Sequence, residues 1–275
     1  MSEAVIRILI FAAIFLGMAA WELAQPRRAL VALKGRRWFT NISIVAIDAL
    51  AVRLIFPLAA VGFAIAAQDS GWGLFNLIAI PGWLAGIASF VILDLAVYAQ
   101  HVASHKVPVF WRLHRVHHAD RDFDVTTALR FHPIEILLSM LWKGAVIFLV
   151  GAPPLAVFIF EAVLNGAAVF NHANARLPLG LDRILRLLIV TPDMHRVHHS
   201  AIRGETDSNY GFNLSFWDRI FSTYVPQPSA GHEGMRIGLD DYADDKPTYL
   251  VWSLLLPFRS GRPEGKPEGA RAEGG

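Results

Sequence analysis

Five apolar runs, each long enough to cross a membrane, constrain the fold of this sequence more than any other feature. A transmembrane α-helix needs roughly 20 predominantly apolar residues to cross about 30 Å of hydrocarbon. The runs cover residues 5–24, 42–67, 74–99, 134–150 and 154–170. Hydrophobic residues make up 54% of the chain and charged residues only 17%, which is unlike an ordinary soluble protein. We therefore predict an all-α fold, a multi-span transmembrane helix bundle.

Basic residues between the runs predict the orientation of the bundle. The loop between the first two runs has no acidic residue, and its basic residues are Arg27, Arg28, Lys34, Arg36 and Arg37. The positive-inside rule places such a loop in the cytoplasm. A second basic loop follows the third run and agrees with this count. Every histidine is therefore expected on the cytoplasmic side. Glu3 balances Arg7, so the first run is expected to be a retained span and not a cleaved signal peptide.

The same pattern divides the chain into four predicted parts. Residues 1–84 hold spans one and two, and residues 85–225 hold spans three to five with most histidines. Residues 226–258 are expected to extend a cytoplasmic helical cap. Residues 259–275 are too poor in apolar side chains to bury a core, which predicts a disordered tail. The formal net charge of +2 gives no indication of nucleic-acid binding.

Histidines are concentrated in one part of this apolar chain, since ten of the 11 lie between residues 101 and 199. Asp94, Tyr98, His101 and His105 have helical spacing at the end of the third run, so we expect them on one face. Three clusters hold eight histidines: box 1 is His101 and His105, box 2 is His114, His117 and His118, and box 3 is His195, His198 and His199. On a helix, the three imidazoles of box 2 or box 3 are expected to face one partner.

This spacing predicts a metal site, because two histidines four residues apart on a helix can bind one ion together. Eight or more imidazoles exceed the four to six ligands of one transition-metal ion, which predicts two ions. Neutral imidazole suits iron, zinc, copper and nickel alike. The sequence has no cysteine, which excludes thiolate ligands and iron–sulfur clusters.

Three further histidines have separate predictions. His172, at the end of the fifth run, is a candidate ligand, with a cation at a helix terminus as the alternative. His132 lies at the start of the fourth run. It could be a metal ligand, a hydrogen-bond partner of a ligand or a residue at the membrane interface. His232 has glycine on one side in a polar stretch and is expected to be solvated.

Carboxylates near the boxes are candidates for orienting the ligands, since a ligating imidazole usually donates its other N–H to a carboxylate or carbonyl. Asp94 lies within the third run, where a charge is costly unless paired, and is the first candidate. Asp193 and Asp218 are weaker candidates. Glu161 and Asn165 are further polar residues inside the fifth run.

The boxes and the motifs around them resemble the membrane fatty acid hydroxylase and sterol desaturase superfamily over about residues 85–225. The matching motifs are Asp94-x-x-x-Tyr98-x-x-His101, Arg130-x-His132-Pro133-x-Glu135, Asn171-His172-Ala173-Asn174, Thr191-Pro192-x-x-His195, Asn209-Tyr210-Gly211 and 217–224, with the three boxes in order. Some relatives carry histidine four residues before His172, where this chain has Ala168.

The resemblance implies an iron-dependent oxidoreductase that uses O2 and holds two iron ions between membrane helices and a cytoplasmic cap. Its ligands would be the eight box histidines and His172, and no other catalytic residue is implied. Further candidates for binding a metal or a ligand histidine are His132, Asn174, Asp94 and Tyr98. Zinc could replace iron in isolated protein, because affinity alone favours zinc.

The implied substrate is a lipid, such as a fatty acyl chain or a sterol, that enters from the bilayer. Electrons would come from a separate donor, such as a cytochrome b5-like protein, a ferredoxin or a reductase, because no dinucleotide-binding Gly-x-Gly-x-x-Gly motif is present. Arg112, Arg115 and Arg196 could dock an acidic electron donor or a lipid headgroup, or supply ordinary cytoplasmic positive charge. Trp217 and Tyr224 are expected to anchor the chain at the interface, with a cap over the site as the alternative.

The residues leave three points open. Hydroxylation and desaturation are both compatible with the motifs. Transport or storage of a divalent metal is an alternative, although transporters place their ligands near the middle of the bilayer. A haem-binding electron carrier is a third possibility, but eight clustered histidines exceed what haem needs.

Overall fold

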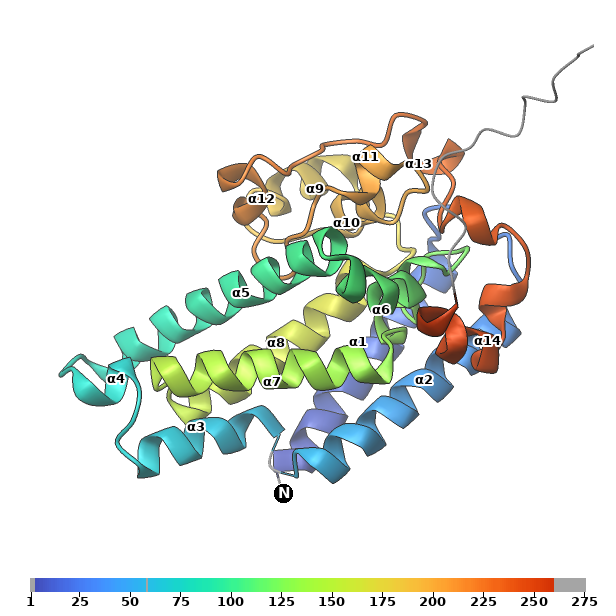
Figure 1. Cartoon of the computed structure of the whole chain (residues 1–275). Helices are drawn as coiled ribbons and strands as arrows, with labels where there is room; N and C mark the ends of the chain where they lie inside the picture. The colour runs from blue at the N-terminus through green and yellow to red at the C-terminus, as the bar shows by residue number, and fades with distance from the viewer. Residues whose placement is uncertain (1–2, 58, 260–275) are drawn as a thin grey trace, which may run out of the picture.

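The computed structural model describes residues 3–57 and 59–259, which form a bundle of long helices covered at one end by shorter ones (Figure 1). The long helices are α1 (Glu3–Ala24), α2 (Lys34–Ile55), α5 (Gly82–Lys106), α7 (Pro133–Val150) and α8 (Pro154–Asn171). The short helices are α3 (Ala59–Asp69), α4 (Leu74–Leu77), α6 (Pro108–His118), α9 (Leu179–Leu185), α10 (Pro192–His198), α11 (Arg203–Thr206), α12 (Phe216–Ile220), α13 (Gly231–Gly234) and α14 (Leu250–Leu255). Four 3-10 turns, η1 (Thr127–Leu129), η2 (Asp240–Tyr242), η3 (Lys246–Thr248) and η4 (Leu256–Phe258), complete the described chain.

The predicted all-α multi-span fold is confirmed. Five segments of the described chain are long and apolar enough to span a membrane, and this part of the chain contains no β-strand beyond isolated bridges. Large apolar side chains cover the outside of the long helices, for example Leu16, Leu54 and Leu149. Such an exposed apolar surface is stable only in contact with lipid.

The predicted second span, residues 42–67, is wrong as one continuous helix. The helix begins earlier, at Lys34, and α2 ends at Ile55. Pro57 lacks a backbone N–H and restricts the residue before it, and Phe56 has a non-helical backbone with φ −124° and ψ 72°. A separate helix, α3, continues the run and packs against α7 and α8.

The predicted third span, residues 74–99, is also displaced. Leu74–Leu77 is the separate α4, and α5 starts at Gly82, directly after Pro81. The turn before α4 contacts the turn between α7 and α8. A Cβ on Gly73 would lie 2.4 Å from the backbone N of Gly151, so glycine is required there. At its other end α5 continues to Lys106 and includes box 1.

The interior of the bundle is apolar where α3, α5, α7 and α8 meet. Leu93, Ile147 and Phe160 are almost fully buried in this cluster. A second cluster joins α1 to the end of α8 through Ala19 and Val169. These contacts hold the ends of α5 and α8 side by side. His101 and His105 lie at this end of α5, and His172 lies at this end of α8.

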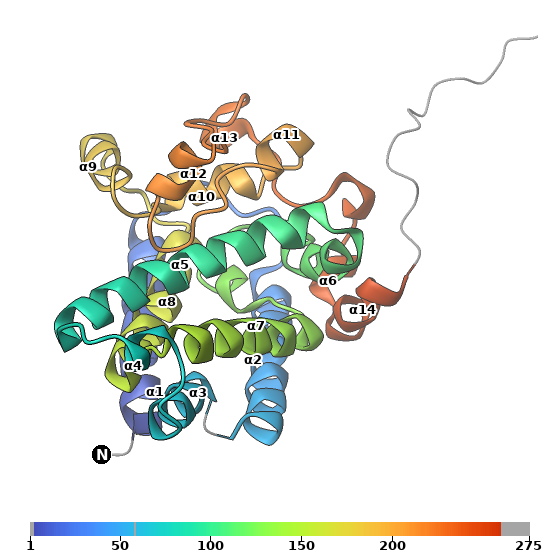
Figure 2. The ribbon, with the colours of Figure 1, turned by 60° about the vertical axis from the view of Figure 1, so that its left-hand side comes forward.

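The chain after α8 forms a layer over one end of the bundle, and Figure 2 shows α10–α13 gathered on the same side of α5. The last helix, α14, lies apart from this layer, beside α2 and η3 (Figure 1). The predicted tail, residues 259–275, lies outside the described residues except for Arg259.

A buried polar network joins α2 to the loop after α6. Arg37, counted above as a basic loop residue, is fully buried and donates to Asp120 at 2.6 and 2.8 Å and to Asp124 at 2.8 Å. Arg130 is also fully buried and donates to the carbonyl of Val116 and to Ser253 Oγ. These cations therefore fix the loop that follows box 2 and are not solvated charges.

Replacing Arg37 by Met should destabilise the protein strongly, because Asp120 and Asp124 would remain buried without their cation. Breaking a buried pair in this way costs about 3–5 kcal/mol. The matched control is Arg36→Met, since Arg36 is exposed and contacts Tyr249 only at the surface. Thermal unfolding in detergent should give a clearly lower midpoint for Arg37→Met alone, and equal midpoints would contradict this role.

Candidate metal centre

Box 1 and its neighbours form one stripe of α5, as the spacing predicts. Asp94, Tyr98, His101 and His105 are all buried on this helix. Box 2 lies on α6, which begins at Pro108, and box 3 lies on α10 with His199 as its C-terminal cap. Proline at the first position of each of these two helices removes a backbone N–H that would lack a helical partner.

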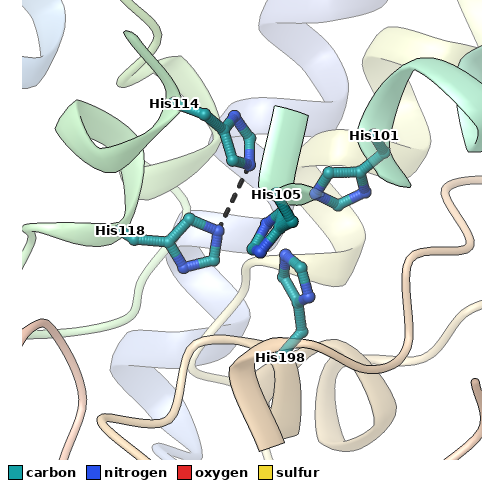
Figure 3. Close-up of side chains that lie close together, drawn as sticks. All are labelled: His101, His105, His114, His118 and His198. Atoms are coloured by element: carbon teal, nitrogen blue, oxygen red, sulfur yellow. Dashed lines mark hydrogen bonds between the residues drawn. The ribbon is translucent and has the colours of Figure 1, made fainter. Parts of the chain in front are cut away.

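The eight box histidines and His172 are brought together in two groups (Figure 3 shows the first). Group A consists of His101, His105, His114, His118 and His198, and group B of His117, His172, His195 and His199. Within each group the candidate ligand atoms all lie within 4.8 Å of one another. All nine side chains are buried, with at most 8% of their surface exposed.

Each three-histidine box is divided between the groups, which corrects the expectation that its imidazoles face one partner. In box 2, His114 and His118 belong to group A and His117 to group B. In box 3, His195 and His199 belong to group B and His198 to group A. The two residues four apart stay together because they lie one turn apart on the same helix face, while the third points to the other side.

The inner nitrogens of both groups fit a metal ion. The Nε2 atoms of His105, His198 and His199 are buried and have no hydrogen-bond partner. The Nε2 atom of His172 lies 3.2 Å from that of His117 and 3.1 Å from that of His195. His172 donates from Nδ1 to the carbonyl of Ala168 at 2.7 Å, so its Nε2 carries a lone pair. Converging lone pairs of this kind are stabilised by a shared cation.

The imidazoles are held in the neutral form that binds metal. Burial, and then repulsion from His114, lowers the pKa of His198 from 6.5 to about 3. Burial likewise lowers the pKa of His172 to about 4, which disfavours its alternative role as a helix-end cation. Burial is also the main reason why the pKa values of four further rings fall well below 6.5, those of His117, His118, His195 and His199.

The outer nitrogens of group A are fixed by hydrogen bonds from the surrounding chain. His101 donates from Nδ1 to the carbonyl of Tyr210 at 2.8 Å, and His198 donates to the carbonyl of Ser208 at 2.7 Å. Asp218 accepts hydrogen bonds from the N–H groups of Tyr210 and Gly211, at 2.7 and 2.8 Å. Asp218 therefore orients His101 indirectly, by fixing the backbone at Tyr210.

Two carboxylates that contact histidines of group A directly are not among the site residues expected from the sequence. Glu135, on the first turn of α7, accepts from His114 Nδ1 at 2.6 Å. Asp207 accepts from His105 Nδ1 at 3.3 Å and also pairs with Lys106. Glu135 lies in the Arg130-x-His132-Pro133-x-Glu135 motif. An acidic residue in the first turn of a predicted span could therefore have indicated a partner for a histidine.

Four candidates from the sequence lie outside both groups. His132 caps α7, accepting from the N–H of Ile134, and its Nε2 donates to the carbonyl of Leu254 at 3.1 Å. Asn174 exchanges hydrogen bonds with the backbone of Arg28. Asp94 accepts from Trp217 Nε1 at 2.9 Å, and Tyr98 bonds Thr223 at 2.8 Å. These side chains hold surrounding segments in place.

His232 is not solvated as predicted: it is buried, and its Nε2 lies 3.5 Å from Asp193. The expectation failed because the polar stretch around it folds back over α10. Asp193, a candidate for orienting a ligand, accepts hydrogen bonds from Arg27 and Arg196. Burial lowers the pKa of His232 to about 4, although Asp193 acts in the opposite direction.

Of the three arginines within the boxes, Arg115 and Arg196 are buried, whereas Arg112 is exposed. Arg196 is fully buried against Asp193. Arg115 donates to the carbonyls of Leu256 and Arg259, and Arg112 to that of Pro257. They fasten the C-terminal segment to α6. Trp217 is buried against Asp94, so its predicted role as an interface anchor is wrong.

A cavity of 580 Å³ leads from the histidines into the helix bundle. Its wall at the metal end includes His101, His114, His117 and His195, so it reaches both groups. Further along, the wall is largely apolar; Val52, Phe56, Val97, Met140 and Leu164 are part of it. A hydrocarbon chain in this cavity would reach the histidines without crossing bulk water.

The part of the chain that carries the histidine groups also matches a known protein family. The fatty acid hydroxylase family model matches residues 86–223, which is half of the chain and includes all nine grouped histidines. The chain belongs to the fatty acid hydroxylase family. The predicted resemblance is therefore confirmed.

Relatives of this family member include several lipid hydroxylases. It is 33% identical to the ornithine lipid hydroxylase OlsE of Rhizobium tropici, over 54% of this chain and 45% of the relative. It is 30% identical to the alkylglycerol monooxygenase of Xenopus tropicalis, over 71% of this chain and 43% of the relative. The chain thus spans less than half the length of these two relatives. No solved structure matches it significantly.

Acid should destabilise the metal-free protein, because the unfolded chain takes up protons at histidines that the folded protein keeps neutral. For His172, with a pKa lowered from 6.5 to about 4, the stability present above pH 6.5 is lost progressively as the pH falls toward the folded pKa, by up to about 3 kcal/mol. The thermal midpoint of chelator-treated protein should fall over this window, and His172→Gln should show a shallower decline. A midpoint independent of pH would contradict these neutral imidazoles.

Proposed function

We propose that the protein is an integral membrane oxygenase that uses O2 and external electrons to hydroxylate a C–H bond of a lipid. The observation that carries this proposal is the position of the two histidine groups at the end of a cavity lined mainly by apolar side chains of the spans. The relatives are named as lipid hydroxylases and monooxygenases, which favours hydroxylation over desaturation.

The proposed ligands are the five histidines of group A and the four of group B, one iron ion to each group. Group B has one ligand fewer, and Ala168 stands where some relatives carry a further histidine. Iron, when bound, supplies the activation of O2 and the oxidation of the C–H bond. Isolated protein would exchange iron for zinc readily, because nitrogen ligands bind zinc more tightly than iron(II).

The residues of this chain position the ligands and exclude water. Glu135 and Asp207 fix the outer nitrogens of His114 and His105 and keep the inner nitrogens directed at the centre. The layer of α10–α13 covers the centre, and the cavity wall holds the substrate chain against His101 and His117. Electrons would come from a separate donor protein.

The buried, enclosed groups favour catalysis over metal transport. A transported ion needs a continuous polar path, whereas the cavity that reaches these histidines is largely apolar. We also propose that the histidine end faces the cytoplasm, in keeping with the basic loops, and that residues 85–225 form the catalytic part, with 1–84 and 226–258 supporting it.

Single replacements should separate the two groups. His198→Ala should lower metal occupancy in group A and His117→Ala that in group B, each giving less iron per chain than the unmodified protein and no hydroxylation. His132→Ala is the control, because His132 lies outside both groups and should keep both ions. The measurements are metal content of purified protein and lipid profiling of cells carrying each variant.

The contrary results are specific. Full activity in His117→Ala or His198→Ala would overturn the ligand assignment. A Soret band in the purified protein would replace the proposal with a haem carrier. Metal-loaded protein whose expression leaves every cellular lipid unmodified would favour metal storage.

A further inference from the structure

An acidic side chain within α2 lines the cavity. Asp48 is only 5% exposed, and its Oδ1 atom is buried with no hydrogen-bond partner in the described chain. Lys143, also in the cavity wall, pairs with Glu161 on α8, and Arg7 lies 4.0 Å from the same carboxylate. Arg53, on the same helix as Asp48, is exposed and donates to a backbone carbonyl. A carboxyl group within a membrane span is costly unless it is paired, and such groups usually mark a functional site.

The buried face of α2 fixes the position of Asp48. Arg37, Asn41, Ile44 and Asp48 are buried at intervals of three or four residues, which places them on one face of the helix. Arg37 and Asn41 anchor this face through hydrogen bonds to Asp120. Asp48 therefore faces the interior of the bundle, at a fixed place along the cavity, and does not face lipid.

A second carboxylate with an unpaired oxygen lines the same cavity. Glu135 accepts from His114 with its Oε1 atom, whereas its Oε2 atom is buried without a partner among the described residues. The charge of Glu135 acts on Asp48, so the two carboxyl groups lie within electrostatic range of each other. Because Glu135 contacts a histidine of group A, these two acceptors lie at the metal end of the cavity.

We propose that Asp48, together with the unpaired oxygen of Glu135, binds a hydrogen-bond donor at the polar end of the lipid substrate, a hydroxyl or an amino group. A buried carboxyl oxygen without a partner is destabilising, and a bound donor removes this penalty. The hydrocarbon chain extends from this donor subsite along the apolar wall, which includes Met140 and Leu164. The proposal rests on the proposed function, because it takes the cavity as the site of the substrate.

The alternative is a structural role, in which Asp48 shares a proton with Glu135 and so holds α2 against α7. Removal of the Asp48 carboxyl group should then destabilise the ligand-free protein, as the loss of a buried hydrogen bond does. In the proposed subsite the carboxyl group has no partner until a ligand binds. Replacing it by an apolar side chain should therefore raise the thermal midpoint of the ligand-free protein and weaken the binding of a donor ligand.

The test measures equilibrium binding of radiolabelled ligands to full-length protein in phosphatidylcholine nanodiscs without reductant, since this lipid carries no hydrogen-bond donor. The ligands are dodecanol, dodecylamine and 1-chlorododecane, which share one chain length and differ at the polar end. The unmodified protein should bind dodecanol or dodecylamine about tenfold more tightly than 1-chlorododecane, or about 1.4 kcal/mol. Asp48→Leu should abolish this preference and raise the thermal midpoint. Asp69→Leu, which removes an exposed carboxylate outside the cavity, should change neither.

A preference led by dodecylamine identifies an amino group as the donor, and one led by dodecanol identifies a hydroxyl group. Equal binding of all the ligands by the unmodified protein, a preference that survives in Asp48→Leu, or a lower midpoint of this variant without ligand overturns the subsite. If Asp48→Leu does not fold, Asp48→Ala removes the same carboxyl group without adding volume, and failure of both assigns Asp48 the structural role. Absence of lipid hydroxylation with the expected binding order would refute the proposed function alone, and hydroxylation without that order would refute the subsite alone.

Discussion

The centre depends on keeping nine imidazoles neutral and oriented in a space closed to water. Burial is the first cause of the lowered pKa values of His172 and His198, and repulsion among neighbouring rings adds to it. Neutral rings with inward Nε2 lone pairs are costly to crowd together unless a cation takes up the lone pairs. The helix bundle, the covering layer and the buried arginine network together supply the apolar packing and hydrogen bonds that offset this cost.

The hydrogen bonds that orient the imidazole rings differ between the two groups. Carboxylates or carbonyls hold the outer nitrogens of four group A rings, those of His101, His105, His114 and His198. In group B, a comparable bond is made by His172 to the carbonyl of Ala168, while the Nδ1 atoms of His117 and His195 are buried without a partner. Group A is thus the more firmly oriented position, and the orientation of group B relies more on ring packing, such as that of His117 on Phe131.

Much of the fold and site could be predicted from local pattern, and the errors have physical causes. Hydropathy identified the apolar runs, but it did not register that Pro57 ends α2 or that Pro81 delays α5. Helical spacing identified the histidines that come together, but it did not show that each three-histidine box divides between two groups. The burial of His232 and of Arg196 arises from contacts between distant segments, which no local pattern contains. Predicting the contact of Glu135 with His114 would have required knowing which end of α7 faces box 2.

The division of boxes 2 and 3 has a mechanical consequence. Since α6 carries His117 on one side and His114 with His118 on the other, any tilt of this helix displaces both groups at once. The same holds for α10. The separation of the two groups is therefore tied to the geometry of these two helices, and a substitution that moves one group also moves the other.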